Sequence, residues 1–148
     1  GLLTLLRHPD QLALLKAHPD WMAPAVEEML RFESPVQRAT FRIVTDDFEL
    51  GEITLQRGQE ISAYLGAANR DPQQFPAPDR FDIQRQPNRH VAFGLGIHFC
   101  LGAPLARAEA RIGFEQLLQA LPDLQLAGEP VWNQNTFIRG LRGLPVVF

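Results

Sequence analysis

The stretch of sequence that decides the fold reads Phe93-Gly94-Leu95-Gly96-Ile97-His98-Phe99-Cys100-Leu101-Gly102. It contains the only cysteine of a chain of 148 residues. Gly94, Gly96 and Gly102 are expected to let the backbone take positive φ and to approach a flat ligand closely. The spacing of these glycines around Cys100 therefore predicts a loop that packs against a large planar cofactor.

Cys100 also lies just before a predicted helix over residues 104–121, whose first turn contains a proline. The free N–H groups and the positive dipole end of such a helix favour a thiolate over a thiol. A thiolate binds iron and pushes electron density onto the metal, which favours O–O cleavage. His98 can donate a hydrogen bond to an anionic edge group of a macrocycle, and Phe93 and Phe99 can shield the sulfur.

Two other interpretations of a single cysteine stay open at this point. Cys100 could be a small buried hydrophobic residue, which is a common fate of free cysteines. It could also be the nucleophile of an acyl-transfer enzyme, with a histidine as its base. A nucleophile needs one tight turn, whereas three glycines around an aromatic-shielded sulfur favour close packing against a cofactor.

The overall composition is that of a globular protein, with 45% hydrophobic and 21% charged residues. A net charge of -3 without a basic run argues against nucleic-acid binding, and no apolar stretch approaches the roughly 20 residues that cross a bilayer. One cysteine cannot form an internal disulfide, which fits a cytoplasmic protein. The chain begins inside an apolar helical pattern without an N-cap, so residues 1–148 are expected to be the C-terminal part of one longer domain.

Sequence periodicity predicts a mainly α fold with small β sheets. Helices are expected over residues 2–7, 9–16, 23–32 and 104–121, with a short helical turn before residue 70. Short strands are expected within residues 39–45, 48–54, 60–64, 124–126, 131–138 and 144–148. Residues 71–89 contain four prolines and little periodicity. A loop of this length in a compact domain is usually functional.

The cysteine loop resembles the Phe-Gly-x-Gly-x-His-x-Cys-x-Gly signature of the cytochrome P450 superfamily, and Leu105-Ala106-Arg107 continues the match. The resemblance implies that Cys100 is the proximal ligand of the iron in haem b. It also implies that His98 helps to bind a haem propionate and that Ala106 lies near the haem face of the next helix. The remaining residues expected to form the haem-binding loop are Phe93, Gly94, Gly96 and Gly102.

Glu28 and Arg31 are three residues apart and share one face of a predicted helix. By itself such a pair is usually a solvated surface bridge, and Glu27 could pair with Arg31 equally well. The resemblance selects Glu28, because the family carries a buried Glu-x-x-Arg pair at this place. It also nominates Arg80, within Pro78-Asp79-Arg80-Phe81, as a second arginine that ties the long loop to the helices.

Arg42 lies on a strand-like run, where an isolated arginine is usually an exposed strand charge. The resemblance implies that it pairs with a haem propionate, with Arg38 as the weaker alternative. Val36, Phe137 and Ile138 correspond to positions that line the substrate pocket in the family. Apolar residues at strand ends are nevertheless more often plain core.

The resemblance extends in order along essentially the whole chain. It implies a monooxygenase that inserts one atom of dioxygen into a small, mainly apolar organic substrate. A ferredoxin or flavodoxin-like electron donor is expected to dock on the proximal face near Cys100. The acid or amide and the threonine that deliver protons in this family have no counterpart here, so no catalytic residue is expected and the chain alone is expected to be inactive. The alternatives are a peroxygenase or dehydratase with the same loop, a non-enzymatic haem-binding module and a cysteine-nucleophile enzyme.

Overall fold

The computed structural model describes residues 1–148 and confirms a mainly α fold with small β sheets. The helices are α1 (Leu2–Arg7), α2 (Pro9–Ala17), η1 (Pro19–Trp21), α3 (Met22–Glu33), α4 (Leu65–Ala68), η2 (Gly96–His98) and α5 (Ala103–Ala120). The strands are β1 (Arg42–Ile43), β2 (Phe48–Leu50), β3 (Ile53–Leu55), β4 (Glu60–Ile61), β5 (Gln125–Leu126), β6 (Val131–Trp132), β7 (Leu141–Gly143) and β8 (Val146–Val147). Most observed strands are shorter than the predicted ones, and β7 lies between two predicted strands and was missed, whereas the helix ends agree within one residue.

The hydrophobic core joins the first three helices to the long loop. Its nine buried residues are Leu5, Leu12, Leu15, Met22, Ala25, Val26, Met29, Phe81 and Ile83. Because Phe81 and Ile83 come from the loop, this segment belongs to the core although it has no regular structure. The side chain of Gln11 on α2 accepts a hydrogen bond from the Ile83 N–H at 3.0 Å, which fixes the loop on the helices.

Helix α3 is placed by its apolar face and by its C-terminus. Val26 and Met29, three residues apart, both point into the core. The helix ends at Ser34, which takes the left-handed conformation with φ 42°, and Pro35 follows. Since the residue before a proline avoids the helical conformation, this ending is encoded locally. Helices α3 and α5 then pack against each other.

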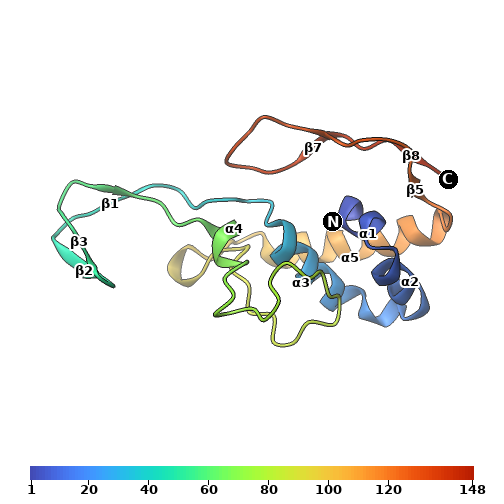
Figure 1. The fold of residues 1–148 in the computed structure, drawn as a ribbon, viewed down its shortest axis with the longest axis horizontal. Helices are drawn as coiled ribbons and strands as arrows, with labels where there is room; N and C mark the ends of the chain where they lie inside the picture. Colours follow the sequence, from blue (N-terminus) through green and yellow to red (C-terminus); the bar gives the residue numbers. More distant parts are fainter.

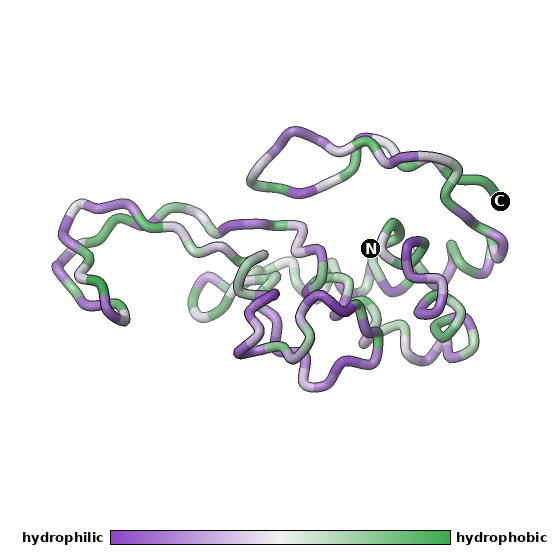
Figure 2. The backbone as a smooth tube through the Cα atoms, in the orientation of Figure 1, coloured by the Kyte–Doolittle hydropathy of each residue, from purple (hydrophilic) through white to green (hydrophobic).

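The eight strands form four separate antiparallel pairs: β1 with β4, β2 with β3, β5 with β8 and β6 with β7. Figure 1 shows the first two pairs as an arm that projects from the helical body and the last two as a C-terminal strap above it. The long loop lies on the opposite side of the body and is mostly hydrophilic in Figure 2. No helix combines the length and the hydropathy that a membrane span requires.

The long loop is held by Glu28 and Arg31, whose side chains are fully buried. Arg31 Nε and Nη2 donate to the two carboxylate oxygens of Glu28 at 2.7 and 2.8 Å. The same guanidinium donates to the carbonyl oxygens of Asn69, Pro78 and Arg80 at 2.8, 2.9 and 3.2 Å. Loop carbonyls that lack a secondary-structure partner therefore find one on a charged side chain.

The second arginine of this network is Arg85, and the prediction of Arg80 is wrong. Arg85 Nε donates to Glu28 Oε1 at 3.2 Å, and its side chain is 9% exposed. The Arg80 side chain is 69% exposed and lies near Asp82. A turn just before Arg80 directs its carbonyl inward, where it accepts hydrogen bonds from Arg31 and Arg85, so its side chain faces solvent.

This correction can be tested by comparing Arg85→Met with Arg80→Met in urea unfolding. Loss of the Arg85 guanidinium leaves part of the buried Glu28 carboxylate and several loop carbonyls without a donor. We expect Arg85→Met to lower the free energy of unfolding by about 2 kcal/mol, the cost of a hydrogen bond to a charged group. Arg80→Met should change it by less than about 0.5 kcal/mol, as for an exposed side chain. Equal losses in the two variants would refute the assignment of Arg85.

Candidate functional site

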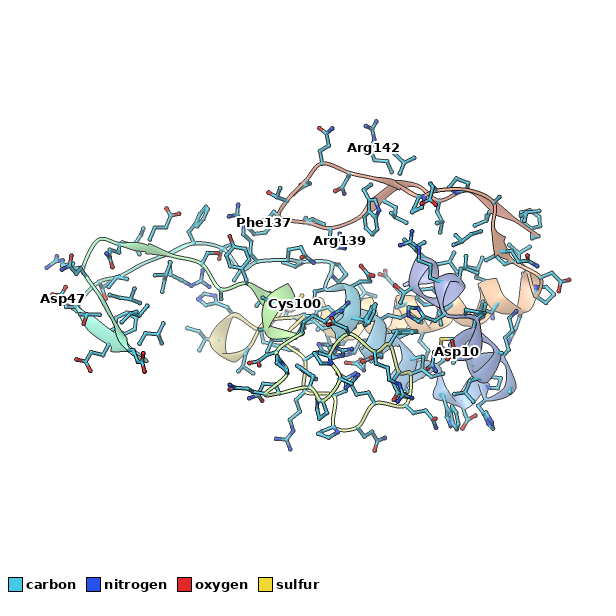
Figure 3. The ribbon with its side chains drawn as sticks, in the orientation of Figure 1. Asp10, Asp47, Cys100, Phe137, Arg139 and Arg142 are labelled. Carbon is cyan, nitrogen blue, oxygen red and sulfur yellow. The ribbon has the colours of Figure 1, made fainter.

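The cysteine loop closes one end of a cavity of about 700 Å³, lined mainly by hydrophobic residues. Its walls come from the segment after α3, the base of the arm, α4 and the loop itself. Arg42, His98 and Cys100 all contribute to its wall. Figure 3 shows Cys100 beside α4. The cavity therefore brings together one thiol, one guanidinium group and one imidazole within a mainly apolar surface.

The loop backbone has the predicted positive φ at two of its three glycines. Gly94 and Gly96 both have φ +74°, a region that L side chains rarely adopt. Gly102 has φ -81° and is the N-cap residue of α5, so the prediction of positive φ there is wrong. A helix start requires no left-handed residue. A Cβ at Gly102 would lie 3.8 Å from the Cys100 Sγ, which is an ordinary van der Waals contact, so the sulfur does not require a glycine here.

Cys100 is a free, exposed cysteine whose sulfur lies close to the start of α5. Its N–H donates to the Phe93 carbonyl at 2.9 Å, and its carbonyl accepts from the Ala103 N–H at 3.2 Å. These bonds fix the backbone on both sides of the side chain. The N–H groups of the first α5 turn give this end of the helix a positive potential. Ala106, one turn further on, does not line the cavity.

Two aromatic rings and one histidine flank this sulfur in sequence. Phe93 and Phe99 form an edge-to-face pair with ring centroids 6.5 Å apart. His98, at the end of η2, lines the cavity. The chain contains no cluster of three or more histidine, cysteine, aspartate or glutamate side chains that could hold a metal ion.

Arg42 and Arg38 lie in different surroundings, although they are close in sequence. Arg42 lines the cavity and donates from Nη1 to the carbonyl oxygens of Thr40 and Phe41, each at 3.1 Å. The Arg38 guanidinium lies over the rings of Phe41 and Phe137, and its buried Nε has no hydrogen-bond partner. Of the two arginines, Arg42 is the one beside the cysteine loop.

The three predicted substrate contacts are close to one another but only one lines the cavity. Val36 is a lining residue and forms an antiparallel bridge with Ile138. The Phe137 carbonyl accepts a hydrogen bond from the Gln37 N–H at 3.0 Å. Phe137 lies at the turn of the β6–β7 hairpin in Figure 3, and Ile138 is half exposed. The hairpin is thus tied to the strand end that forms part of the cavity wall.

A charged cluster beside the cysteine loop was missed by sequence reasoning. Arg107 on α5 donates to both carboxylate oxygens of Glu27 on α3, at 2.6 and 2.8 Å. His90 Nδ1 accepts from the Ala92 N–H at 3.2 Å, so its Nε2 carries the proton and donates to Glu27 at 3.0 Å. Glu27 entered the sequence reasoning only as a rival partner for Arg31. No local pattern connects it with positions more than 60 residues away.

These contacts determine the protonation of the Glu27 carboxyl. Burial raises its pKa, but the hydrogen bonds from His90 and Arg107 outweigh burial and lower the pKa from 4.5 to about 2. The same carboxylate raises the pKa of Arg107. Glu27 and Arg107 therefore both stay charged around neutral pH, and their ion pair persists.

Glu27→Gln tests this pKa through the pH dependence of stability. A carboxyl whose pKa is lower in the folded state stabilises the protein above its unfolded pKa, and this contribution is lost as the pH falls through the folded value. The free energy of unfolding should therefore fall less steeply between pH 4.5 and about 2 in Glu27→Gln than in the unmodified protein. Urea midpoints across this range measure the slope. Glu109→Gln, an exposed residue on α5, serves as the control, and an unchanged slope in Glu27→Gln would contradict the assignment.

Comparison with known proteins gives one consistent result. The family model described as cytochrome P450 matches residues 21–135. The chain is 50% identical over 149 residues to the cytochrome P450 monooxygenase PikC of Streptomyces venezuelae, which covers 99% of this chain and 36% of that protein. It is 48% identical to the polyketide biosynthesis cytochrome P450 PksS of Bacillus subtilis, with 99% of this chain and 37% of that protein covered.

The structural comparison agrees with the sequence comparison. P450BioI, solved in complex with an acyl carrier protein ligated to hexadec-9Z-enoic acid, superposes with a TM-score of 0.96 and 48% identity. The match covers 99% of this chain and 38% of that one. The chain thus spans 36% to 38% of the length of these relatives. Since the family model matches most of the chain and the likeness extends over all of it, the chain belongs to the cytochrome P450 family.

Proposed function

We propose that this chain is the haem-binding part of a haem-thiolate monooxygenase, with Cys100 as the axial ligand of haem b. The observation that carries the proposal is the shared cavity, whose mainly apolar wall includes Cys100, Arg42 and His98. Because the relatives are more than twice as long, we attribute the activity to the complete protein, meaning this chain together with the remaining part of the fold that its relatives have.

The residues around the cavity fit this cofactor. Positive φ at Gly94 and Gly96 lets the backbone lie flat against a planar ring without Cβ atoms at the two sharpest bends. Arg42 and His98 supply donors for two carboxylates at the edge of the ring. The remaining lining is mostly apolar, as a porphyrin face requires. The exposed sulfur of Cys100 is accessible to the metal from the loop side.

When bound, the haem supplies the iron that receives electrons and activates dioxygen. The Cys100 sulfur, as a thiolate ligand, would donate electron density to that iron. Phe93 and Phe99 would add apolar surface near the sulfur, which would tune its donor strength. No aspartate or glutamate lines the cavity. We therefore propose that none of these residues delivers protons to oxygen, and that the complete protein supplies this step elsewhere.

The substrate and the partner are proposed at the level of chemical class. The relatives include a polyketide biosynthesis P450 and a P450 solved with a fatty acyl group on its carrier protein. Together with the apolar cavity wall, this supports a mainly apolar organic substrate. Ile97 and Leu101, which flank Cys100 in sequence, are almost fully exposed, and we place a ferredoxin or flavodoxin-like donor on this face. The single free cysteine fits a cytoplasmic location.

Cys100→Ala in the complete protein tests the ligand assignment. The reduced, carbon monoxide-treated protein should show the absorption band of thiolate-ligated haem, and Cys100→Ala should abolish that band because no thiolate remains. Leu101→Ala, at the exposed neighbouring position, should keep it. Persistence of the band in Cys100→Ala would rule out the proposal. A protein without haem whose Cys100 is alkylated rapidly by iodoacetamide would instead identify a cysteine nucleophile.

The assignment of Arg42 to a haem carboxylate is tested by haem affinity. Arg42→Met removes a donor from the cavity wall, and we expect the apparent Kd for haem to rise by about tenfold, as for the loss of an outer partner of a metal site. Arg38→Met is the matched control because this arginine lies outside the cavity wall. Transfer of haem to an excess of apomyoglobin measures both variants. A larger effect in Arg38→Met would reverse the assignment.

A further inference from the structure

The cluster of Glu27, His90 and Arg107 contacts the cysteine loop through one aromatic ring. The Arg107 guanidinium carbon lies 4.7 Å from the centroid of the Phe93 ring. The carbonyl of the same residue, Phe93, accepts the hydrogen bond from the Cys100 N–H. The Arg107 cation therefore holds the ring of Phe93, the residue whose carbonyl fixes the Cys100 backbone.

We propose that Arg107, oriented by Glu27 and His90, is a positioning residue for the Cys100 thiolate and acts through Phe93. The inference rests on the proposed function, because a thiolate ligand is what the cluster would position. Arg107 itself does not line the cavity. Its role is to hold the Phe93 ring in place and to keep one positive charge on the protein side of the loop.

The geometry of the cluster distinguishes it from an ordinary surface ion pair. Arg107 binds Glu27 with two nitrogens, so its guanidinium plane is fixed rather than free to rotate. The second partner of Glu27, the His90 side chain, is only 3% exposed. Three separate segments, α3, α5 and the end of the long loop, thus converge on one carboxylate.

The fixed guanidinium has two physical consequences for the loop. A cation over an aromatic face is attracted to the ring, so the Phe93 ring stays in one orientation. The positive charge also favours the ferrous state over the ferric state, since reduction adds an electron to a centre that already carries an anionic thiolate. Loss of Arg107 should therefore lower the reduction potential and loosen the loop.

The experiment measures the haem reduction potential and the haem dissociation rate of the complete protein. Arg107→Met should lower the potential and increase the dissociation rate by about tenfold, the typical effect of losing an outer partner of a metal site. Arg107→Lys, which keeps the charge but not the two-nitrogen contact, should restore part of both. Arg111→Met is the matched control, because Arg111 lies one turn further on α5, is exposed and makes no ion pair.

A double-mutant cycle with Phe93→Leu tests whether Arg107 acts through the ring. In the Phe93→Leu background, Arg107→Met should increase the haem dissociation rate much less than in the unmodified protein, whereas the shift in potential, which comes from the charge, should persist. Full additivity of the two changes in dissociation rate would overturn the inference, and so would an Arg107→Met protein that matches Arg111→Met in both measurements. If the unmodified protein shows no thiolate-ligated haem band, the proposed function itself fails. The two failures are therefore distinguishable.

Discussion

The ion pair between Glu28 and Arg31 is the interaction on which the rest of the structure depends. Both side chains are fully buried, and Glu28 has a second charged partner in Arg85. A buried ion pair adds little net stability compared with well-packed hydrophobic residues, but removal of one partner leaves a buried charge and costs several kcal/mol. The pair is therefore better explained by what it organises. It presents donors to three carbonyls of the loop and its entry, and acceptors to Asp82, Arg85 and Asn88.

This arrangement lets a segment without helix or strand behave as a rigid part of the body. Backbone groups of such a loop normally remain near water, because few partners are available to them in the interior. Here the guanidinium groups of Arg31 and Arg85 donate hydrogen bonds to carbonyls that have no partner in a helix or strand. Phe81 and Ile83 add apolar contacts with α2 and α3. Asn69 joins the two ends of the loop to the end of α3, since its side chain donates to Ser34 and accepts from the Val91 N–H. The path from the end of α3 to the cysteine loop is fixed at both ends.

Local signals predicted much of this structure, and the failures have a common cause. Helix ends followed from Pro9, Ser34 and Pro104, and the glycine spacing led to the cysteine loop, because these features act within a few residues. The resemblance nominated Arg80 and missed Arg85, because the turns of the loop set which side chain faces inward and no periodicity reveals that. Long-range contacts could not be predicted either, because Glu27 binds His90 and Arg107, which lie 63 and 80 residues further along the chain.

The two adjacent glutamates of α3 show how one helix positions two different parts of the site. Successive residues of an α-helix point about 100° apart, so Glu27 and Glu28 face different neighbours. Glu28 faces the long loop and is fully buried, whereas Glu27 faces α5 and remains partly exposed. Rotation of α3 by one residue would turn both carboxylates away from their arginines. Because α3 also supplies Val26 and Met29 to the core, the hydrophobic packing fixes this rotation. The orientation of the cysteine loop thus follows from the same apolar face that builds the fold.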